Sequence, residues 1–108
     1  MPVPVDMEEL ISLIGSGALF LVDVYAAWCH PCRLLDSEIE ALEGALPDLK
    51  VVKVDYDSAE GLTDVIPVRA LPLLVLFHKG KEILRMKGFQ KSGKILEQVR
   101  EALPGTDL

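Results

Sequence analysis

An almost uninterrupted apolar stretch at residues 19–27 does most to constrain the fold of this chain. The stretch has the length of a strand, and its lack of polar alternation is typical of a strand that is covered on both faces. Apolar residues then recur at helical intervals from His30 to about Leu46, and a second apolar segment follows at residues 50–56. A strand, a helix and a strand in this order predict a crossover between parallel strands.

Two further helices are predicted around this unit. Asp6 precedes apolar residues at helical spacing, which indicates a first helix that ends at Gly15 to Gly17. After the second strand, Ser58 is expected to cap a short helix that carries apolar residues. Pro67 ends this helix because its ring cannot continue the helical hydrogen-bond ladder.

The last third of the chain predicts a hairpin and a final helix. Two apolar segments at residues 73–77 and 82–86 flank a short turn that contains a glycine, the pattern of two antiparallel strands. Gly88 closes this hairpin. A final apolar stripe with helical spacing then ends before Pro104. The sheet is therefore expected to contain both parallel and antiparallel strands.

Length and charge restrict the class of protein. With 108 residues the chain can form one domain with a single core, and we expect residues 1–108 to form it. The formal net charge of −6, with no cluster of Lys or Arg to offset it, disfavours nucleic acid and anionic membranes as partners. A monomer is expected, since one core accounts for the apolar residues.

Targeting signals are not evident in the sequence. No apolar run approaches the roughly 20 residues needed to cross a bilayer. A secretory signal places basic residues ahead of its apolar segment, whereas the first basic residue here is Arg33. We therefore expect a cytoplasmic protein.

The two cysteines, Cys29 and Cys32, stand where the buried strand gives way to the long helix. Cys29 is expected at the helix N-terminus, where free amides and the helix dipole favour a thiolate, and Cys32 follows one turn later as the resolving thiol. Pro31 suits the first helical turn, in which its missing amide hydrogen has no cost. The spacing therefore predicts a redox-active pair.

Two other interpretations of the cysteine pair remain open at this point. A tetrahedral zinc site needs four ligands, and only His30 and His78 supplement the pair, so we expect no metal. The thiols could also be buried and inert, although the adjacent Trp28 and His30 argue against that interpretation.

The sequence resembles the thioredoxin family over nearly its whole length. The resemblance is carried, in the family's usual order and spacing, by Val22-Asp23, Trp28-Cys29-His30-Pro31-Cys32, Lys53, Leu71-Pro72 and Gly88. It implies the α/β thioredoxin fold, in which a mixed central sheet, made of a parallel strand–helix–strand half and an antiparallel hairpin, has helices on both faces. It also implies a thiol–disulfide oxidoreductase that needs no cofactor beyond its cysteines.

The resemblance assigns supporting roles to Asp23 and Lys53. An ionised carboxylate inside an apolar strand loses its hydration, so Asp23 is expected to hold its proton to unusually high pH. The matching aspartate in the family is thought to accept the proton of the second cysteine, here Cys32, with the matching lysine nearby. As alternatives, Asp23 could lie at a partly hydrated strand end, and Lys53 could point to solvent.

An apolar surface for substrate is expected around Cys29. By resemblance, Leu71-Pro72 has a cis peptide bond, which leaves the Leu71 backbone free to pair with an extended substrate strand. The other residues expected on this surface are Trp28, Gly88 and, with less support from the sequence, Tyr56 and Phe89. Each of these residues could instead serve packing, and Pro72 could be no more than a residue that begins a strand.

His30 is where the chain departs from the commonest cytosolic thioredoxins, which carry glycine at that place. A cation or strong donor beside Cys29 stabilises the thiolate and makes the disulfide a stronger oxidant, unless the imidazole only faces water. The expected partners are disulfide-containing proteins and an unidentified reductase as electron donor. An oxidase or isomerase, and a binding module without enzymatic activity, remain alternatives.

Overall fold

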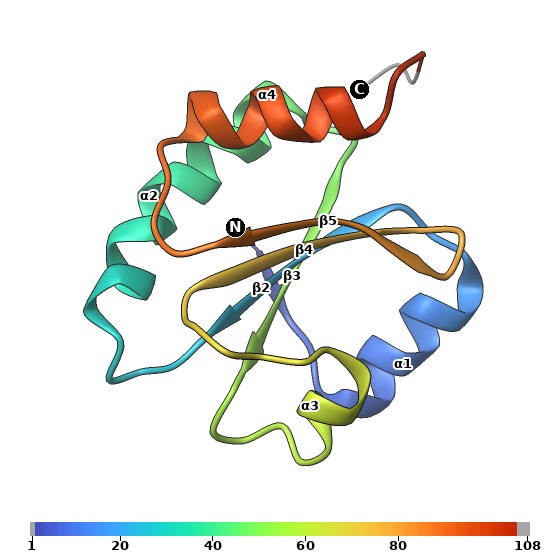
Figure 1. The fold of residues 1–108 in the computed structure, drawn as a ribbon, viewed down its shortest axis with the longest axis vertical. Coiled ribbons are helices and arrows are strands. Elements are labelled where there is room, and N and C mark those ends of the chain that lie inside the picture. The colour runs from blue at the N-terminus through green and yellow to red at the C-terminus, as the bar shows by residue number, and fades with distance from the viewer. Residues whose placement is uncertain (1, 106–108) are drawn as a thin grey trace.

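The computed structural model describes residues 2–105, and its centre is a five-stranded sheet with the strand order β1-β3-β2-β4-β5 (Figure 1). Met1 and residues 106–108, which belong to the expected domain of residues 1–108, lie outside the described residues. In chain order the elements are β1 (Val3–Pro4), α1 (Met7–Ser16), β2 (Phe20–Tyr25), α2 (His30–Ala45), β3 (Lys50–Asp55), α3 (Leu62–Val65), β4 (Leu73–His78), β5 (Lys81–Lys87) and α4 (Ser92–Ala102).

The central strand β2 pairs with a parallel neighbour on one side and an antiparallel neighbour on the other. It runs parallel to β3 and antiparallel to β4, which in turn pairs with β5 in the predicted hairpin. This arrangement confirms the predicted crossover and the mixed sheet. The sequence pattern misses β1, which pairs in parallel with β3, because two residues are too few to show a periodicity. An edge strand tolerates Pro4, since its missing amide need not donate to a neighbour.

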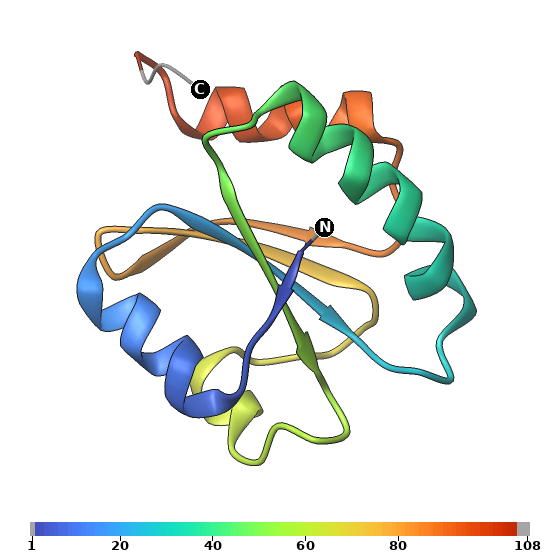
Figure 2. The ribbon, with the colours of Figure 1, turned by 180° about the vertical axis from the view of Figure 1, so that it is seen from behind.

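Helices cover both faces of the sheet, as the resemblance implies (Figures 1 and 2). On one face α2 and α4 bury a cluster that includes Leu21, whereas on the other face α1 and α3 bury a cluster that includes Phe20, Val22 and Val24. Side chains of a strand alternate between its two faces, so β2 is buried on both. Asp23, two residues after Leu21, therefore points into the layer formed by α2 and α4.

The long helix α2 begins directly after Cys29, as predicted. Its 16 residues bury one face against the sheet through Cys32, Leu35, Ile39 and Leu42. The described part of the chain contains no helix with both the length and the apolar character needed to cross a membrane.

The start of α1 is as predicted, whereas the start of α3 is not. Asp6 and Glu9 form a reciprocal capping box, in which the Asp6 carboxylate accepts from the Glu9 amide at 2.8 Å. The expected cap by Ser58 is wrong, because α3 begins only after Gly61. The Ser58 hydroxyl instead donates to Asp55 Oδ2 at 3.0 Å, in the turn that follows β3.

The N-terminus of α4 depends on a side chain from α2. Lys91, at the N-cap position, offers no side-chain hydrogen bond to the helix. The amide of Ser92 instead donates to Glu38 Oε1 at 2.8 Å, and Lys91 Nζ lies 4.0 Å from Glu38 Oε2. The carboxylate satisfies one free amide of the first turn and lies at the positive end of the helix dipole. Glu38 thus links the two helices that cover the face of Asp23.

We predict that Glu38→Ala lowers the free energy of unfolding by about 1 kcal/mol, the usual cost of losing an N-terminal cap. Urea unfolding of the oxidised protein at pH 7 measures this loss. Glu40→Ala, which removes an exposed carboxylate from the same helix, is the matched control. An equal loss in both variants would show that helix charge, rather than the contact with Ser92, explains the effect.

Candidate active site

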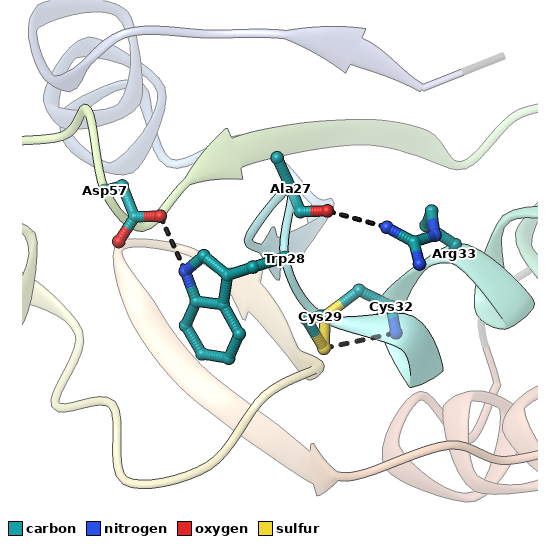
Figure 3. Close-up of a disulfide and its surroundings, with 6 residues drawn as sticks. All are labelled: Ala27, Trp28, Cys29, Cys32, Arg33 and Asp57. Atoms are coloured by element: carbon teal, nitrogen blue, oxygen red, sulfur yellow. Dashed lines mark hydrogen bonds between the residues drawn. A yellow bond between two sulfur atoms is a disulfide. The ribbon is translucent and has the colours of Figure 1, made fainter.

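A disulfide bond joins Cys29 and Cys32 at the N-terminus of α2 (Figure 3). Their Cα atoms are 5.3 Å apart, and Cys29 is the N-cap residue of the helix, with Pro31 in the first turn. The amide of Cys32 donates to Cys29 Sγ at 3.3 Å. Both cysteines are nearly buried, with 5% and 3% of their surface exposed. The predicted pair is therefore formed, and its first cysteine lies where helix amides favour negative charge.

The residues on either side of the disulfide are fixed by contacts that the sequence pattern does not reveal. Trp28 is 67% exposed, yet its indole Nε1 donates to Asp57 Oδ2 at 2.8 Å (Figure 3). Arg33 Nη1 donates to the carbonyl oxygen of Ala27 at 2.8 Å. Asp57 is not among the predicted site residues. Its position after β3 could have indicated it, because β3 is parallel to β2 and the residues that follow the two strands lie near the same edge of the sheet.

A groove of about 450 Å³ lies beside Cys29. Its lining combines the active-site motif with the loop that precedes β4, and consists of Trp28, Cys29, His30, Pro31, Tyr56, Val68, Arg69, Ala70 and Leu71. The structure thus brings Trp28, Tyr56 and Leu71 together, as expected for a docking surface. The sequence does not predict that residues 68–70 line this groove, because a loop without regular periodicity gives no hydrophobic pattern to interpret.

The peptide bond between Leu71 and Pro72 is cis, as the resemblance implies. Leu71 packs against the small cluster of Ala26, Cys29 and Cys32, while Pro72 is buried. The amide of Gly88 donates to the carbonyl oxygen of Pro72 at 2.8 Å, with Gly88 at a φ of +79° that favours glycine. Gly88 therefore supports the loop and does not line the groove.

Phe89 is exposed by 39% and lies outside the groove. Lys91 Nζ lies 5.9 Å from the centre of its ring, within range of a cation–π interaction.

Asp23 is buried, with 2% of its surface exposed. The pKa of Asp23 is raised to about 7, chiefly by burial and also by the carboxylate of Asp36, against a partial decrease from the Lys53 ammonium. Among the described residues, Oδ1 of Asp23 has no hydrogen-bond partner. The expectation of a desolvated carboxyl group is confirmed, and a hydrated strand end is excluded.

Lys53 occupies the position on β3 that is paired with Asp23. Its side chain is partly buried, and Nζ lies 5.4 Å from the centre of the Tyr25 ring, two residues after Asp23 on the same face of β2. The alternative that Lys53 merely points to solvent is therefore wrong. Asp36, an exposed residue of α2, was missed by sequence analysis because no strand or helix pattern relates it to Asp23.

The two histidines are far apart. His30, the first residue of α2, is exposed and lines the groove. His78 is the last residue of β4 and follows Phe77, which pairs with Phe20 at the start of β2. Cys29 follows the opposite end of β2, so His78 does not approach the cysteines. Within residues 2–105, no three His, Cys, Asp or Glu side chains converge so as to bind a metal ion.

Comparison with known proteins relates this arrangement to one family. The thioredoxin family model matches residues 4–101. The thioredoxin of Chlamydia trachomatis serovar D is 36% identical over 95 residues, which cover 88% of this chain and 92% of that protein. The structure of chloroplastic thioredoxin z aligns with a TM-score of 0.83 at 32% identity and covers 97% of both chains. Fasciola hepatica thioredoxin aligns with a TM-score of 0.81 at 34% identity, covering 94% of this chain and 99% of that one.

We predict that Asp23→Asn stabilises the oxidised protein at pH 8 and has much less effect at pH 4. The folded protein holds the Asp23 proton up to a pKa of about 7, whereas the unfolded chain releases it near 3.8. Between these values the folded state binds more protons, so its stability falls as pH rises. At pH 8 the gain in unfolding free energy is at most roughly 4 kcal/mol.

Urea unfolding at several pH values between 4 and 8 measures this gain. Asp48→Asn, which removes an exposed carboxylate outside the site, is the control and should show no comparable pH-dependent gain. A difference between Asp23→Asn and the unsubstituted protein that stays constant with pH would contradict the burial effect.

Proposed function

This chain belongs to the thioredoxin family and is an oxidoreductase of protein disulfides, and on that premise we propose a role for each residue of its site. One observation carries the proposal: the Cys29–Cys32 bond closes the first turn of α2 at a point where Cys29 lines a largely apolar groove. After reduction, the amides of that turn and the helix dipole stabilise a thiolate at Cys29. Cys29 is the nucleophile and Cys32 the resolving cysteine.

The reaction proceeds in two exchange steps. The Cys29 thiolate attacks one sulfur of a substrate disulfide, which forms a mixed disulfide and expels the other substrate sulfur as a thiolate that takes up a proton. Cys32 then loses its proton and attacks Cys29 Sγ, so the intramolecular bond forms and the second substrate sulfur leaves. The substrate gains two electrons, and the Cys29–Cys32 dithiol loses them.

Asp23 accepts the proton of Cys32 in the second step, directly or through one water molecule. Its position on the face of β2 that α2 covers, and a pKa near 7, support this role, since a base is most effective when its pKa is close to the working pH. Lys53, paired with Asp23 in the sheet, supports the charged form of the carboxylate.

Substrate docks over the groove. Trp28 and Leu71 provide apolar contact, and the backbone of Leu71 pairs with an extended substrate segment, which gives affinity with little demand on sequence. Pro72 and Gly88 hold the loop in place through the hydrogen bond between their backbones.

The proposed setting of the reaction is the cytoplasm, where this protein contributes to redox homeostasis and electron transfer. The reaction consumes a dithiol, so a reductase must restore it, and we propose such an enzyme as the electron donor. We propose that the protein acts as a monomer that spans residues 1–108 as one domain.

We predict that Cys32→Ser accumulates covalent adducts with disulfide-containing proteins, because a mixed disulfide at Cys29 then lacks its resolving thiol. Adducts are measured on non-reducing gels after incubation with an oxidised protein, and a reductant should release them. Cys29→Ser serves as the matched control, with neither adducts nor turnover.

Three outcomes would overturn the scheme. Absence of adducts in Cys32→Ser would contradict the division of roles between the cysteines. Disulfide turnover that persists in Cys29→Ser would contradict the nucleophile, whereas a protein without any turnover would be the non-enzymatic binding module considered above.

The exposed His30 beside Cys29 favours a second candidate direction, oxidation or isomerisation of substrate thiols. We predict that His30→Gly lowers the reduction potential of the cysteine pair by about 10–20 mV. The reason is that an exposed charge is worth about 0.5–1 kcal/mol here, and about 30 mV corresponds to 1.4 kcal/mol. Equilibration with glutathione measures the potential.

Glycine at position 30 also changes the freedom of the backbone, so His30→Gln is used to remove the imidazole alone. This variant should also lower the reduction potential. His78→Gln, remote from the cysteines, is the control. An unchanged potential in both variants at position 30 would show that the imidazole does not influence the thiolate.

A further inference from the structure

We propose that Arg69 selects substrate segments that carry an aspartate or glutamate close to the attacked cysteine. The inference rests on the proposed function and adds to it a class of substrate. Arg69 lies in the loop between α3 and β4, is exposed, and lines the same groove as Cys29.

The guanidinium of Arg69 has no partner among residues 2–105. Arg33 donates to the carbonyl of Ala27 at 2.8 Å, and Arg85 Nη2 donates to Glu82 Oε1 at 2.7 Å. By contrast, Arg69 makes no hydrogen bond or ion pair with any residue in the described range 2–105. Its five donors are therefore available to a segment that docks in the groove.

The charge of the groove is opposite to that of the whole protein. The chain carries a formal net charge of −6, yet no carboxylate lines the groove among the described residues, and its basic lining residues are Arg69 and His30. The nearby Asp57 accepts the hydrogen bond of the Trp28 indole. A local excess of hydrogen-bond donors on an acidic surface fits a carboxylate, whereas a lysine in the docked segment would meet like charge.

The spacing of the loop indicates where that carboxylate lies. Arg69 precedes Leu71 by two residues, both line the groove beside Cys29, and Leu71 packs against the cluster that contains the cysteines. Alternate residues of an extended segment point to the same side. Residues 69–72 form a bend along the groove. An extended substrate segment whose attacked cysteine lies beside Cys29 can therefore place a side chain two residues away within reach of Arg69, which lines the same groove. Guanidinium and carboxylate match in a two-point hydrogen-bonded pair.

Synthetic peptides test the proposal. Each contains one cysteine, linked by a disulfide to a common reporter thiol, with Glu, Gln or Lys two residues before or after that cysteine. Rates are measured in a single turnover with the pre-reduced protein, so no reductase is needed. Each rate is divided by the rate with dithiothreitol, which corrects for the intrinsic reactivity of the peptide disulfide.

On at least one side of the cysteine, the corrected rate should be about two- to fivefold higher for Glu than for Gln, the range expected for an exposed ion pair. Lys should be slower than Gln, and salt should reduce these differences. Arg69→Gln should bring the ratio of Glu to Gln close to one, and Arg69→Glu should make Lys the preferred residue. Arg100→Gln, which removes the same charge from α4 outside the groove, should keep the ratio of the unsubstituted protein.

Equal corrected rates for all peptides would overturn the inference and leave the proposed function intact. A preference for Glu that persists in Arg69→Gln would also overturn it, since another residue would then be responsible. Failure of the reduced protein to cleave any peptide would instead contradict the proposed function itself, and with it the inference.

Discussion

Burial of β2 on both faces is the constraint on which the rest of the structure depends. A strand covered on both sides must carry apolar side chains, and at its carboxyl end the chain leaves the core. The disulfide lies just beyond that end, at the first turn of α2. The same burial desolvates Asp23 within the strand, so one element accounts for the position of the cysteines and for the raised pKa of the acid beneath α2.

Most of the fold could be predicted because its elements are long enough to show a period. The long helix, the parallel crossover and the hairpin all follow from patterns within single segments. Three features could not be predicted in this way. The strand β1 has two residues, the start of α3 depends on a turn that engages Ser58, and the cap of α4 comes from Glu38 on another helix. Each depends on a contact between segments, or on a segment too short to have a pattern.

The residues of the candidate site also fall into those that a local sequence pattern predicts and those that depend on contacts between segments. The cysteines, Trp28, Asp23 and Pro72 could be identified because they belong to motifs with fixed spacing. Asp57, Asp36 and Arg69 could not, since each reaches the site from a different element: the turn after β3, the second turn of α2 and the loop before β4. Motif spacing therefore points to the proposed reacting groups more directly than to the residues that surround them in the fold.

The two cysteines have different electrostatic surroundings. In the proposed scheme, the surroundings of Cys32 affect the rate of the second exchange step, whereas those of Cys29 affect the direction of electron flow. Around Asp23, burial and Asp36 raise the pKa while Lys53 lowers it, and the result near 7 leaves the carboxyl group able both to accept and to return a proton. Proton transfer can therefore serve reduction and oxidation alike. The direction of electron flow depends instead on the stability of the Cys29 thiolate against the disulfide, to which we propose that the first turn of α2 and His30 contribute. In the proposed scheme, substrate choice depends on a third set of residues, on the loop that ends at Leu71.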